Sequence, residues 1–425
     1  MRFALTAYGS RGDVEPSIVV ARELLRRGHD VHMAVPPNLV GFADAAGVTA
    51  VAYGLDSRAL LETQRNYWTY FFRQPWRHGK ELERLGGEIG EFMTRCWTEE
   101  TSATLESLAD GADLMIAGVV FEQFAANIAE AHGIPLATLH YFPMRANGQV
   151  LPYLPASLGR AALRFYEWIS WSGAIKEVED SQRRRLGLPK ARCPWPQRIS
   201  DRGSLEIQAY DAFIFPGLAA EWAKAGAPRP FVGMLTLGLP TDSDEEVLSW
   251  IAEGTPPIFF GFGSIPIGSA TDTLAVISGA CAQVGERALI CAGGTDSSQF
   301  PDAEHVKVVD AVNYSTVFPH CRAVVHHGGA GTTAAGLRAG MPTLILWNFP
   351  DQPVSGAALK RLKVGTSRRF SATTERTLIA DLREILAPEY ATRARELAAR
   401  TSRASESASD AAALVEHFAR LHRVG

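Results

Sequence analysis

One short run of residues constrains the fold of this chain more than any other. Residues 326–333 hold two histidines, three glycines, one alanine and two threonines. The preceding residues 323–325 are apolar and partly β-branched, which predicts a buried strand, and the sequence from Thr332 onward predicts a helix. The glycine turn therefore joins a strand to a helix, as in a parallel α/β sheet.

This turn has the properties of an anion site. Small residues let the main chain approach a ligand, and the first N–H groups of a helix are unpaired and lie at the positive end of its dipole. The hydroxyl of Thr332 and the imidazole of His327 would add side-chain donors. A plain strand-to-helix turn capped by a threonine is the alternative. The second histidine, together with Asp351 and Gln352 at the next strand-to-helix turn, favours a ligand site.

Composition limits the class of protein. With 425 residues the chain is too long for one ordinary core, so we expect two domains of about 200 residues each. A hydrophobic content of 46% and a charged content of 21% are typical of a globular protein, and a net charge of −4 argues against nucleic acid as the main partner. Five cysteines without metal-ligand spacing indicate reduced thiols. No signal peptide precedes the first strand and no apolar run reaches the ~20 residues of a membrane span, so we expect a cytoplasmic protein.

Strand and helix patterns alternate along both halves of the chain, which predicts two parallel sheets covered by helices. The first half predicts strands at residues 3–7, 30–35, 48–51, 114–117 and 136–139. The second half predicts strands at residues 257–260, 288–291, 306–309, 323–326 and 343–347. A proline-rich, acidic passage between the halves predicts a linker, and residues 406–422 predict a terminal helix.

Residues 56–110 predict a long helical insertion, and its segment 68–77 is unusually aromatic. The aromatic rings of this segment suit a helix that packs into the core. They equally suit an apolar acceptor surface, or a surface that faces a membrane. The sequence leaves these interpretations open, and with the last of them a peripheral contact at the inner face of the membrane.

Three motifs carry a family resemblance. The first is the run Gly9, Ser10, Arg11, Gly12, Asp13, Val14, Glu15 and Pro16, the second is Gly261, Phe262, Gly263 and Ser264, and the third is the glycine turn. Together they resemble the inverting glycosyltransferases of the GT-B fold, family 1, with the opening motif similar to that of glycopeptide-antibiotic and sterol glycosyltransferases. Residues 34–39, 204–211, 215–222 and 261–264 resemble the mycobacterial glycosyltransferases that decorate glycopeptidolipids.

This resemblance implies a domain plan, the α/β GT-B fold with two facing Rossmann-like, doubly wound parallel-sheet domains. Residues 1–235 would form the acceptor-binding domain and residues 236–246 the linker. Residues 247–400 would form the nucleotide-sugar-binding domain. Residues 401–425 would form a terminal helix that returns toward the first domain.

Asp13 is the candidate catalytic residue. It follows the first strand, in a predicted loop that opens a helix. Ligands of open parallel sheets bind beyond the carboxyl ends of the strands, so this loop is a candidate site. A carboxylate there can accept a proton from an acceptor hydroxyl, and the resemblance implies this general-base role. In the alternative interpretation, Asp13 only stabilises a helix N-terminus. Arg11 could contact a phosphate or hold Asp13 in place.

The resemblance also implies the donor-binding residues. The diphosphate and nucleotide would be held by Arg11, Ser264, the main chain of Val312, and the glycine-turn residues His327, Gly328, Gly329, Ala330, Gly331 and Thr332. Asp351 and Gln352 would bind sugar hydroxyls, since carboxylate and carboxamide groups offer acceptors and donors in a fixed plane. Residues 353–356 lack the bulky aromatic residue that many relatives carry, so sugar and acceptor preferences do not transfer.

No metal site is expected. Asp242 and Asp244 have the Asp-x-Asp spacing of metal-dependent glycosyltransferases, but their proline-flanked acidic context predicts a solvated linker. His326 and His327 are poor joint zinc ligands, because adjacent strand residues point to opposite faces. In the metal-free scheme, helix N–H groups and His327 stabilise the leaving group. No cofactor is expected besides the co-substrate, a UDP- or dTDP-sugar.

The resulting hypothesis is transfer of a sugar to a hydroxyl of an apolar natural product, such as a glycopeptidolipid core. A nucleotide-sugar epimerase or a phosphorylase on the same scaffold is one alternative, although no lysine in these motifs supports a pyridoxal-dependent phosphorylase. A catalytically silent partner of another transferase is the other alternative. The fold alone would not decide between them.

Overall fold

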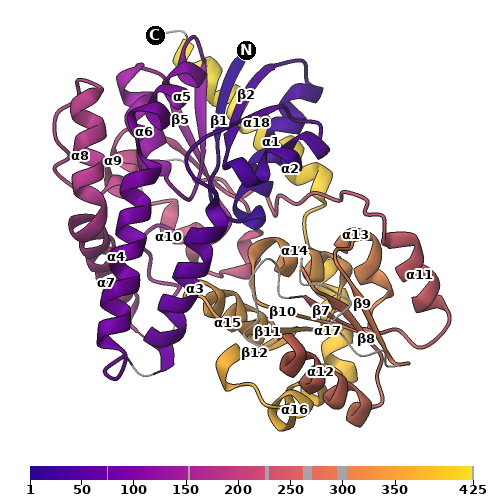
Figure 1. Cartoon of the computed structure of the whole chain (residues 1–425). Helices are drawn as coiled ribbons and strands as arrows, with labels where there is room; N and C mark the ends of the chain where they lie inside the picture. The colour runs from indigo at the N-terminus through magenta and orange to yellow at the C-terminus, as the bar shows by residue number, and fades with distance from the viewer. Residues whose placement is uncertain (74, 152–153, 225–228, 262–269, 294–303, 424–425) are drawn as a thin grey trace. The chain divides into compact units, whose positions relative to one another are not determined.

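The computed structural model describes residues 1–73, 75–151, 154–224, 229–261, 270–293 and 304–423. Its internal contacts divide the chain into two compact units (Figure 1). Unit 1 contains Met1–Leu61, Gly86–Leu237 and Ser402–Gly425, and unit 2 contains Glu62–Leu85 and Gly238–Thr401. Unit 2 thus includes residues from the helical insertion, which the sequence-based boundaries place in the first domain.

Unit 1 is built on a six-stranded parallel sheet with the order β3-β2-β1-β4-β5-β6. The strands are β1 Arg2–Thr6, β2 Asp30–Val35, β3 Ala50–Ala52, β4 Leu114–Gly118, β5 Leu136–His140 and β6 Leu205–Gln208. The five strands predicted in this half are confirmed to within two residues. Edge strand β6 was missed because Glu206 and Gln208 break the apolar pattern, although both are fully buried.

The helices of the first half follow the predicted alternation, and the insertion is confirmed as three helices. They are α1 Arg11–Arg26, α2 Val40–Ala45, α3 Ser57–Arg73, α4 Gly79–Cys96, α5 Glu99–Ala109, α6 Glu122–Ala131, α7 Ala156–Ser170, α8 Lys176–Arg185, α9 Trp195–Asp201 and α10 Leu218–Trp222. A short π-helical segment, Trp171–Ile175, joins α7 to α8. Phe124, Leu105 and Met115 are among the fully buried residues of the core in this unit.

The terminal helix α18, Ala404–Arg423, belongs to unit 1. It packs on α1 (Figure 1). The guanidinium of Arg27 donates to the Ser409 carbonyl at 2.8 Å, and the His29 ring lies 2.7 Å from the Glu416 carboxylate. These polar contacts join the end of the chain to the helix that follows its first strand.

Unit 2 contains a second six-stranded parallel sheet, with the order β12-β11-β10-β7-β8-β9. The strands are β7 Ile258–Gly261, β8 Ala288–Cys291, β9 Val306–Val309, β10 Ala323–His326, β11 Thr343–Trp347 and β12 Gly365–Arg369. The five predicted strands are confirmed. Edge strand β12 was missed because it is polar, with Arg368 paired to Asp381 at 2.5 Å.

The helices of the second half are α11 Asp244–Ala252, α12 Ala270–Val284, α13 Tyr314–Val317, α14 Ala330–Ala339, α15 Gln352–Leu362, α16 Glu375–Ile385 and α17 Pro388–Ala398. Phe260, Ile277 and Leu382 belong to one apolar cluster of this unit, and Phe259, Phe318 and Val324 belong to another. Both clusters draw residues from the sheet and from the helices that cover it.

Both units have the same topology. Counted along the chain within each unit, the strand order is 3-2-1-4-5-6, that of a Rossmann-like doubly wound sheet. The first and fourth strands are neighbours in each sheet, β1 with β4 and β7 with β10. Ligands of such sheets bind beyond the carboxyl ends of the strands where the order reverses. A ligand site is therefore expected at the turns after β1, β4, β7 and β10.

Candidate functional site

Asp13 lies in the first turn of α1 rather than in a loop before it. The helix begins at Arg11, earlier than the apolar pattern indicates, because its first turn is polar. The prediction of a loop position for Asp13 is therefore wrong. One carboxylate oxygen accepts hydrogen bonds from the main-chain N–H and the hydroxyl of Ser10, both at 2.6 Å.

The other oxygen of the Asp13 carboxylate accepts a hydrogen bond from the Tyr141 hydroxyl. Tyr141 follows β5, so residues 128 positions apart in the chain meet at this carboxylate. Burial raises the pKa of Asp13, whereas the hydrogen bonds from Ser10 and Tyr141 lower it. A carboxylate whose pKa is raised by burial lies closer to the working pH of a general base. Asp13 thus accepts hydrogen bonds at the start of α1, and its raised pKa still suits a general base.

Gly9 makes this arrangement possible. Its φ of +116° lies in a region that other residues rarely adopt. A Cβ atom at this position would lie only 2.5 Å from the Asp13 carboxylate. Any larger residue would displace the carboxylate or the turn, so Gly9 is required by the position of Asp13.

Arg11 is exposed and contacts neither Asp13 nor any other acid at hydrogen-bond distance among the described residues. Its guanidinium lies 4.4 Å from the centre of the Phe42 ring and 3.9 Å from the Glu15 carboxylate. The task of holding Asp13, one of the two predicted for Arg11, is carried out by Ser10 and Tyr141. Phosphate contact remains a prediction for Arg11.

The turn between β10 and α14 contains the predicted anion site. The helix begins at Ala330, so the glycines at 328 and 329 precede it and Gly331 is its second residue. Gly328 has a φ of +96°, and a Cβ atom there would lie 2.8 Å from Ile345. At Gly329 a Cβ atom would lie 2.4 Å from the His327 ring, whereas at Gly331 it would have no described atom within 4 Å. The first two glycines are required by the turn, whereas the space beside Gly331 is open among the described residues.

The two histidines of the turn have different environments. His326 is fully buried, and its Nδ1 accepts a hydrogen bond from the Gly328 N–H at 2.9 Å, so it shapes the turn. Burial lowers the pKa of His327 to about 4, against an opposing hydrogen bond with the main chain of Gly261. The Nδ1 atom of His327 is buried without a hydrogen-bond partner among the described residues. A neutral imidazole with an unpaired nitrogen is the group that a ligand could complete.

The N-terminus of α14 is not capped by a protein side chain in the described residues. Its first turn has no acidic residue, and no side chain accepts from its first N–H groups. Thr333 donates its hydroxyl to the Gly329 carbonyl at 2.9 Å, which ties the helix to the turn. Thr332 is the third residue of α14 and is 8% exposed.

Asp351 and Gln352 lie at the start of α15, next to the glycine turn. Gln352 is 4% exposed, and its carbonyl oxygen accepts from the N–H groups of Asn348 at 2.8 Å and Phe349 at 3.0 Å. The Gln352 oxygen therefore shapes the loop after β11, a task the sequence did not indicate. A Cβ atom at Gly328 would lie 3.0 Å from Gln352, so the two turns are in contact.

The other predicted donor residues are placed in part. Ser264 lies outside the described residues. The side chain of Val312 is buried in an apolar cluster with Val247 and Phe259, which leaves its main chain for any ligand contact. Asp244 begins α11 and is 8% exposed, so the prediction of a solvated linker is wrong for this residue. It accepts from Asn313 N–H at 2.8 Å and from the Thr241 hydroxyl at 2.7 Å.

Comparisons with known proteins agree with this geometry. Residues 3–148 match the family model described as glycosyltransferase family 28 N-terminal domain, and residues 276–415 match that of the erythromycin biosynthesis protein CIII-like C-terminal domain. An uncharacterized glycosyltransferase of Mycobacterium tuberculosis is 54% identical over 426 residues, which covers 100% of both chains. This chain belongs to the glycosyltransferases.

More distant glycosyltransferases are also similar. A sterol 3-beta-glucosyltransferase of Arabidopsis thaliana is 28% identical over 437 residues, covering 99% of this chain and 68% of that protein. The crystal structure of the glycosyltransferase VinC in complex with DTDP has a TM-score of 0.65 at 19% identity and covers 99% of this chain and 100% of its own. The predicted fold class, GT-B with Rossmann-like sheets, is confirmed, as is the resemblance to mycobacterial, antibiotic and sterol glycosyltransferases.

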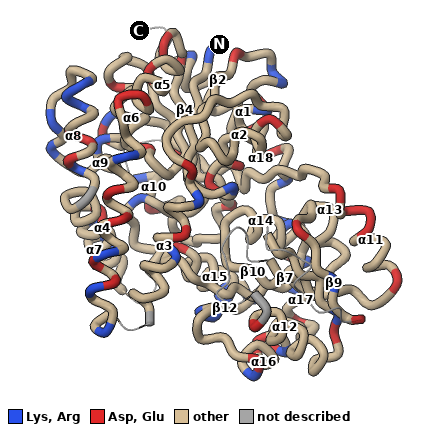
Figure 2. Tube along the Cα trace, in the orientation of Figure 1, with Lys and Arg blue, Asp and Glu red and all other residues tan. Residues whose placement is uncertain are grey.

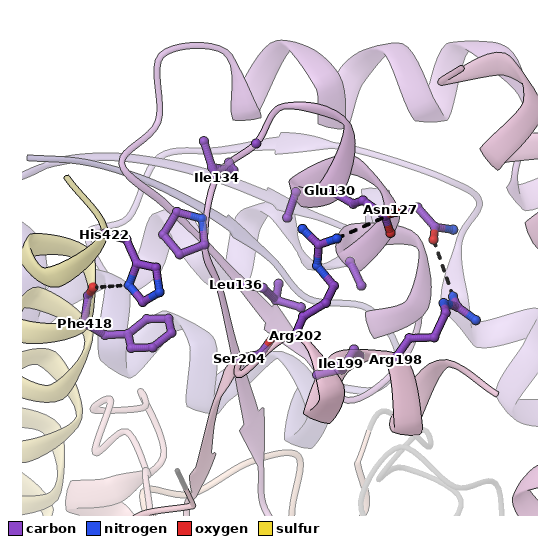
Figure 3. A pocket seen from close by; sticks show the side chains of 14 residues that line it. Asn127, Glu130, Ile134, Leu136, Arg198, Ile199, Arg202, Ser204, Phe418 and His422 are labelled. Atoms are coloured by element: carbon purple, nitrogen blue, oxygen red, sulfur yellow. Dashed lines mark hydrogen bonds and ion pairs between the residues drawn. The ribbon is translucent and has the colours of Figure 1, made fainter. Parts of the chain in front are cut away.

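A cavity of about 190 Å³ in unit 1 of this glycosyltransferase lies elsewhere (Figure 3). It is lined by residues before and at the start of β5, such as Ile134 and Leu136. The cavity therefore lies at the amino ends of the strands, whereas Asp13 follows the carboxyl end of β1. Its polar groups pair with each other, with Arg202 3.7 Å from Glu130 and the His422 ring 2.9 Å from the Phe418 carbonyl. The cavity is a structural feature rather than a second candidate site.

The aromatic segment 68–77 agrees with the core interpretation on one side and with an exposed surface on the other. The Phe72 ring meets the Trp347 ring edge-on at 5.2 Å, and Arg369 donates to the Phe72 carbonyl. Phe71 is 42% exposed and Trp76 is 80% exposed. One side of the segment packs next to the end of β11, close to the loop that leads to Asp351, and the other side faces solvent.

Tyr141 is the functional candidate that sequence reasoning missed. It directly follows β5, and the rule that ligands bind at the carboxyl ends of strands would have included it. The residue before it, His140, is fully buried 3.1 Å from Glu122, in a network with Arg145. This buried network holds the end of β5 and so fixes the position of Tyr141.

Proposed function

We propose that this glycosyltransferase moves a sugar from a UDP- or dTDP-sugar to a hydroxyl of an apolar natural product, with inversion at the anomeric carbon. A lipopeptide such as a glycopeptidolipid core is the proposed acceptor. The observation that carries this proposal is the turn between β10 and α14, where an uncapped helix N-terminus, open space at Gly331 and an unpaired nitrogen of His327 come together. These are the features expected of a diphosphate site.

The donor would be held by this turn and its neighbour. Main-chain N–H groups of residues 329–332 would donate to diphosphate oxygens, and so would His327 in the tautomer that carries its proton on Nδ1. Asp351 would accept from a sugar hydroxyl. The Gln352 oxygen is already engaged by the loop, so Gln352 would reach the sugar through its amide N–H groups. The solved relative VinC is a complex with DTDP, which supports a nucleoside diphosphate as the ligand of this fold.

The chemistry requires one proton transfer and one substitution. The Asp13 carboxylate would take the proton of the acceptor hydroxyl as its oxygen forms a bond to the anomeric carbon. The bond from that carbon to the diphosphate oxygen breaks, and the diphosphate leaves with the electron pair. The N–H groups of α14 stabilise the developing charge without reorganisation, and His327 adds a donor in the tautomer that carries its proton on Nδ1.

No metal ion is required in this scheme. Within the described residues no group of three or more histidine, cysteine, aspartate or glutamate side chains is arranged to hold one. Helix N–H groups can meet the charge of a leaving diphosphate in place of a cation. We therefore expect activity to survive chelation.

The apolar acceptor is supported by one of the relatives. A similar protein of Arabidopsis thaliana is named for a glucosyltransferase that acts on a sterol, an apolar alcohol. The Phe72 ring meets Trp347 at the end of β11, and the exposed Phe71 ring contacts Phe72, so these rings would offer an apolar contact. This similarity supports the proposal of an apolar acceptor.

A donor panel tests the proposal. The purified chain is incubated with UDP- and dTDP-sugars and a crude mycobacterial lipid extract, with and without EDTA, and release of nucleoside diphosphate is measured. We expect extract-dependent release with one donor class, equal in EDTA, and a product with inverted anomeric configuration by NMR. Retained configuration, loss of activity in EDTA restored by magnesium, or donor epimerisation without acceptor would each overturn a stated part.

A further inference from the structure

Helix α7 exposes an unusual number of large apolar side chains. Six of the eleven exposed large apolar residues in the described chain lie between residues 154 and 169. On α7 itself they are Leu158 at 57% exposed, Phe165 at 62%, Tyr166 at 60%, Trp168 at 52% and Ile169 at 48%. Single exposed apolar residues are common on protein surfaces, but a contiguous set on one helix marks an interaction surface.

The spacing of these residues places them on one side of the helix. Leu158, Phe165 and Ile169 are separated by seven and four residues, so they form one continuous stripe. At 100° per residue, Tyr166 lies on one border of this stripe and Trp168 on the other. We call these five residues the α7 stripe. It covers nearly half of the helix circumference.

The opposite side of α7 is polar and faces the protein. Glu167 accepts from the Ala146 N–H at 3.1 Å, and Arg160 pairs with Glu221 at 2.9 Å. Gly159 is the buried residue of the helix, close to the Leu151 side chain. The helix is therefore amphipathic, but unlike an ordinary surface helix it turns its polar contacts toward the protein and its apolar stripe toward solvent. Because these contacts fix its rotation, the stripe cannot turn into the core.

Among the exposed charged residues of α7 and α8, basic residues outnumber acidic ones. Arg164 is exposed and lies on the border next to Trp168, whereas the only acidic residue of α7, Glu167, is turned inward. Beyond the π-helical segment, α8 carries the exposed Glu177 near its start and the exposed Arg184 and Arg185 at its end. Figure 2 shows both kinds of charge along the chain. An apolar stripe bordered by aromatic rings and arginines suits the boundary between acyl chains and anionic headgroups.

We propose that α7 is a membrane-docking helix that lies in the surface of a bilayer containing anionic lipid. None of the described helices is long and apolar enough to span a bilayer, so the contact would be made at the interface. The aliphatic and phenyl groups at the centre of the stripe insert between acyl chains, and Tyr166 and Trp168 lie at the level of the headgroups. Arg164 pairs with lipid phosphates. This inference does not depend on the sugar donor or on the residues of the transfer reaction.

Vesicle sedimentation with the full chain tests this inference. The wild-type protein is mixed with phosphatidylcholine vesicles that contain or lack phosphatidylglycerol. We expect it to bind the anionic vesicles, with binding weakened at 0.5 M salt, because the basic border contributes through screened electrostatics. The double variant Phe165→Gln with Trp168→Gln should bind at least about tenfold more weakly, since it removes the two largest apolar groups of the stripe.

A matched control is available on another helix of the same unit. Leu421 on α18 is 61% exposed, and Leu421→Gln should leave vesicle binding within about twofold. All substituted positions are exposed, so circular dichroism and nucleoside diphosphate binding should stay as in the wild type. Failure of the wild type to sediment with anionic vesicles would overturn the inference. So would a dimer in gel filtration that the double variant dissociates, because the stripe would then be covered by a second copy.

Discussion

Two turns of this glycosyltransferase have the same architecture and opposite electrostatic design. The β1–α1 turn of unit 1 and the β10–α14 turn of unit 2 each follow a strand at the point where the strand order reverses. Each contains a glycine with positive φ, +116° at Gly9 and +96° at Gly328, and each opens a helix. The first turn of α1 contains the carboxylate of Asp13, whereas the first turn of α14 has no acid and no side-chain cap in the described chain.

Gly9, before α1, and Gly331, the second residue of α14, show the same difference. At Gly9 the position of a Cβ atom is already taken, 2.5 Å from the Asp13 carboxylate. At Gly331 that position has no described atom within 4 Å. The comparison suggests that one helix N-terminus is filled by the protein's own negative charge and the other is kept for the charge of a ligand.

The largest effect is expected at the filled turn. Asp13→Asn keeps the shape and most hydrogen bonds of the side chain but removes the negative charge. General-base catalysis typically contributes about 10²–10⁴ in rate, so turnover should fall by that factor. If Asp13 served only the helix terminus, stability would fall by roughly 0.3–1 kcal/mol and turnover would stay near normal. Steady-state kinetics and chemical denaturation of the same preparation separate the two, and turnover within threefold of wild type would exclude Asp13 as the base.

In the turn between β11 and α15, Asp351→Ala should weaken binding of the sugar without weakening binding of the nucleotide. Loss of a charged hydrogen-bond partner typically costs ~1.5–3 kcal/mol, so the intact donor should bind about tenfold more weakly or worse. Free nucleoside diphosphate should bind nearly as in the wild type. Titration calorimetry with both ligands measures this, and Asp242→Ala, at an exposed position, is the control. Equal weakening of both ligands would place Asp351 away from the sugar.

A smaller effect is expected from the hydroxyl that holds Asp13. Tyr141 lowers the pKa of Asp13 through its hydrogen bond, so Tyr141→Phe should raise that pKa. A base must be deprotonated, so the acidic limb of the kcat/KM profile should move to higher pH. A hydrogen bond of ~1 kcal/mol corresponds to a little under one pH unit. Tyr210→Phe, which loses a hydroxyl bonded to Gln208 at 2.8 Å, is the matched control and should leave the limb in place. An unmoved limb in Tyr141→Phe would contradict the assignment.

The smallest effect is expected on stability at acid pH, where His327 in the β10–α14 turn becomes protonated. Burial lowers the pKa of His327 to about 4, whereas the unfolded chain has the ordinary value near 6.5. The unfolded state therefore binds more protons below pH 6.5, and the native state loses stability as the pH falls from there toward 4. His327→Gln should reduce the loss between pH 7 and pH 6 by up to ~0.7 kcal/mol. Urea denaturation at the two pH values measures this, and an unchanged difference would mean that His327 is not buried as described.

Sequence patterns predicted the centres of both sheets better than their edges. The central strands are apolar because helices cover them on both faces. Edge strand β6 contains Glu206, which is fully buried with Arg145 as its partner, and no local pattern reveals a partner 61 residues away. Edge strand β12 was missed for the same reason, since Arg368 in this strand is paired with Asp381 from another element.

The candidate site was predicted as far as local chemistry determines it. The glycine turn could be found from its composition, because strand, small residues and helix follow each other directly. The position of Asp13 inside the helix depends on where the first turn begins, and helix boundaries are poorly marked by polar residues. Tyr141 and the loop contacts of Gln352 could not be predicted, since they arise from tertiary contacts and from the path of the loop after β11.

The affinity of nucleoside diphosphate for two variants tests the central comparison most directly. Gly331→Val places a branched side chain in the open space above α14, where no described atom of the protein competes for it. Asp13→Asn alters the turn that is filled by the protein itself. Titration of UDP and dTDP against wild type and both variants should show binding lost in Gly331→Val, with native far-UV circular dichroism, and kept in Asp13→Asn. Unchanged affinity in Gly331→Val would contradict the assignment of the β10–α14 turn as the diphosphate site.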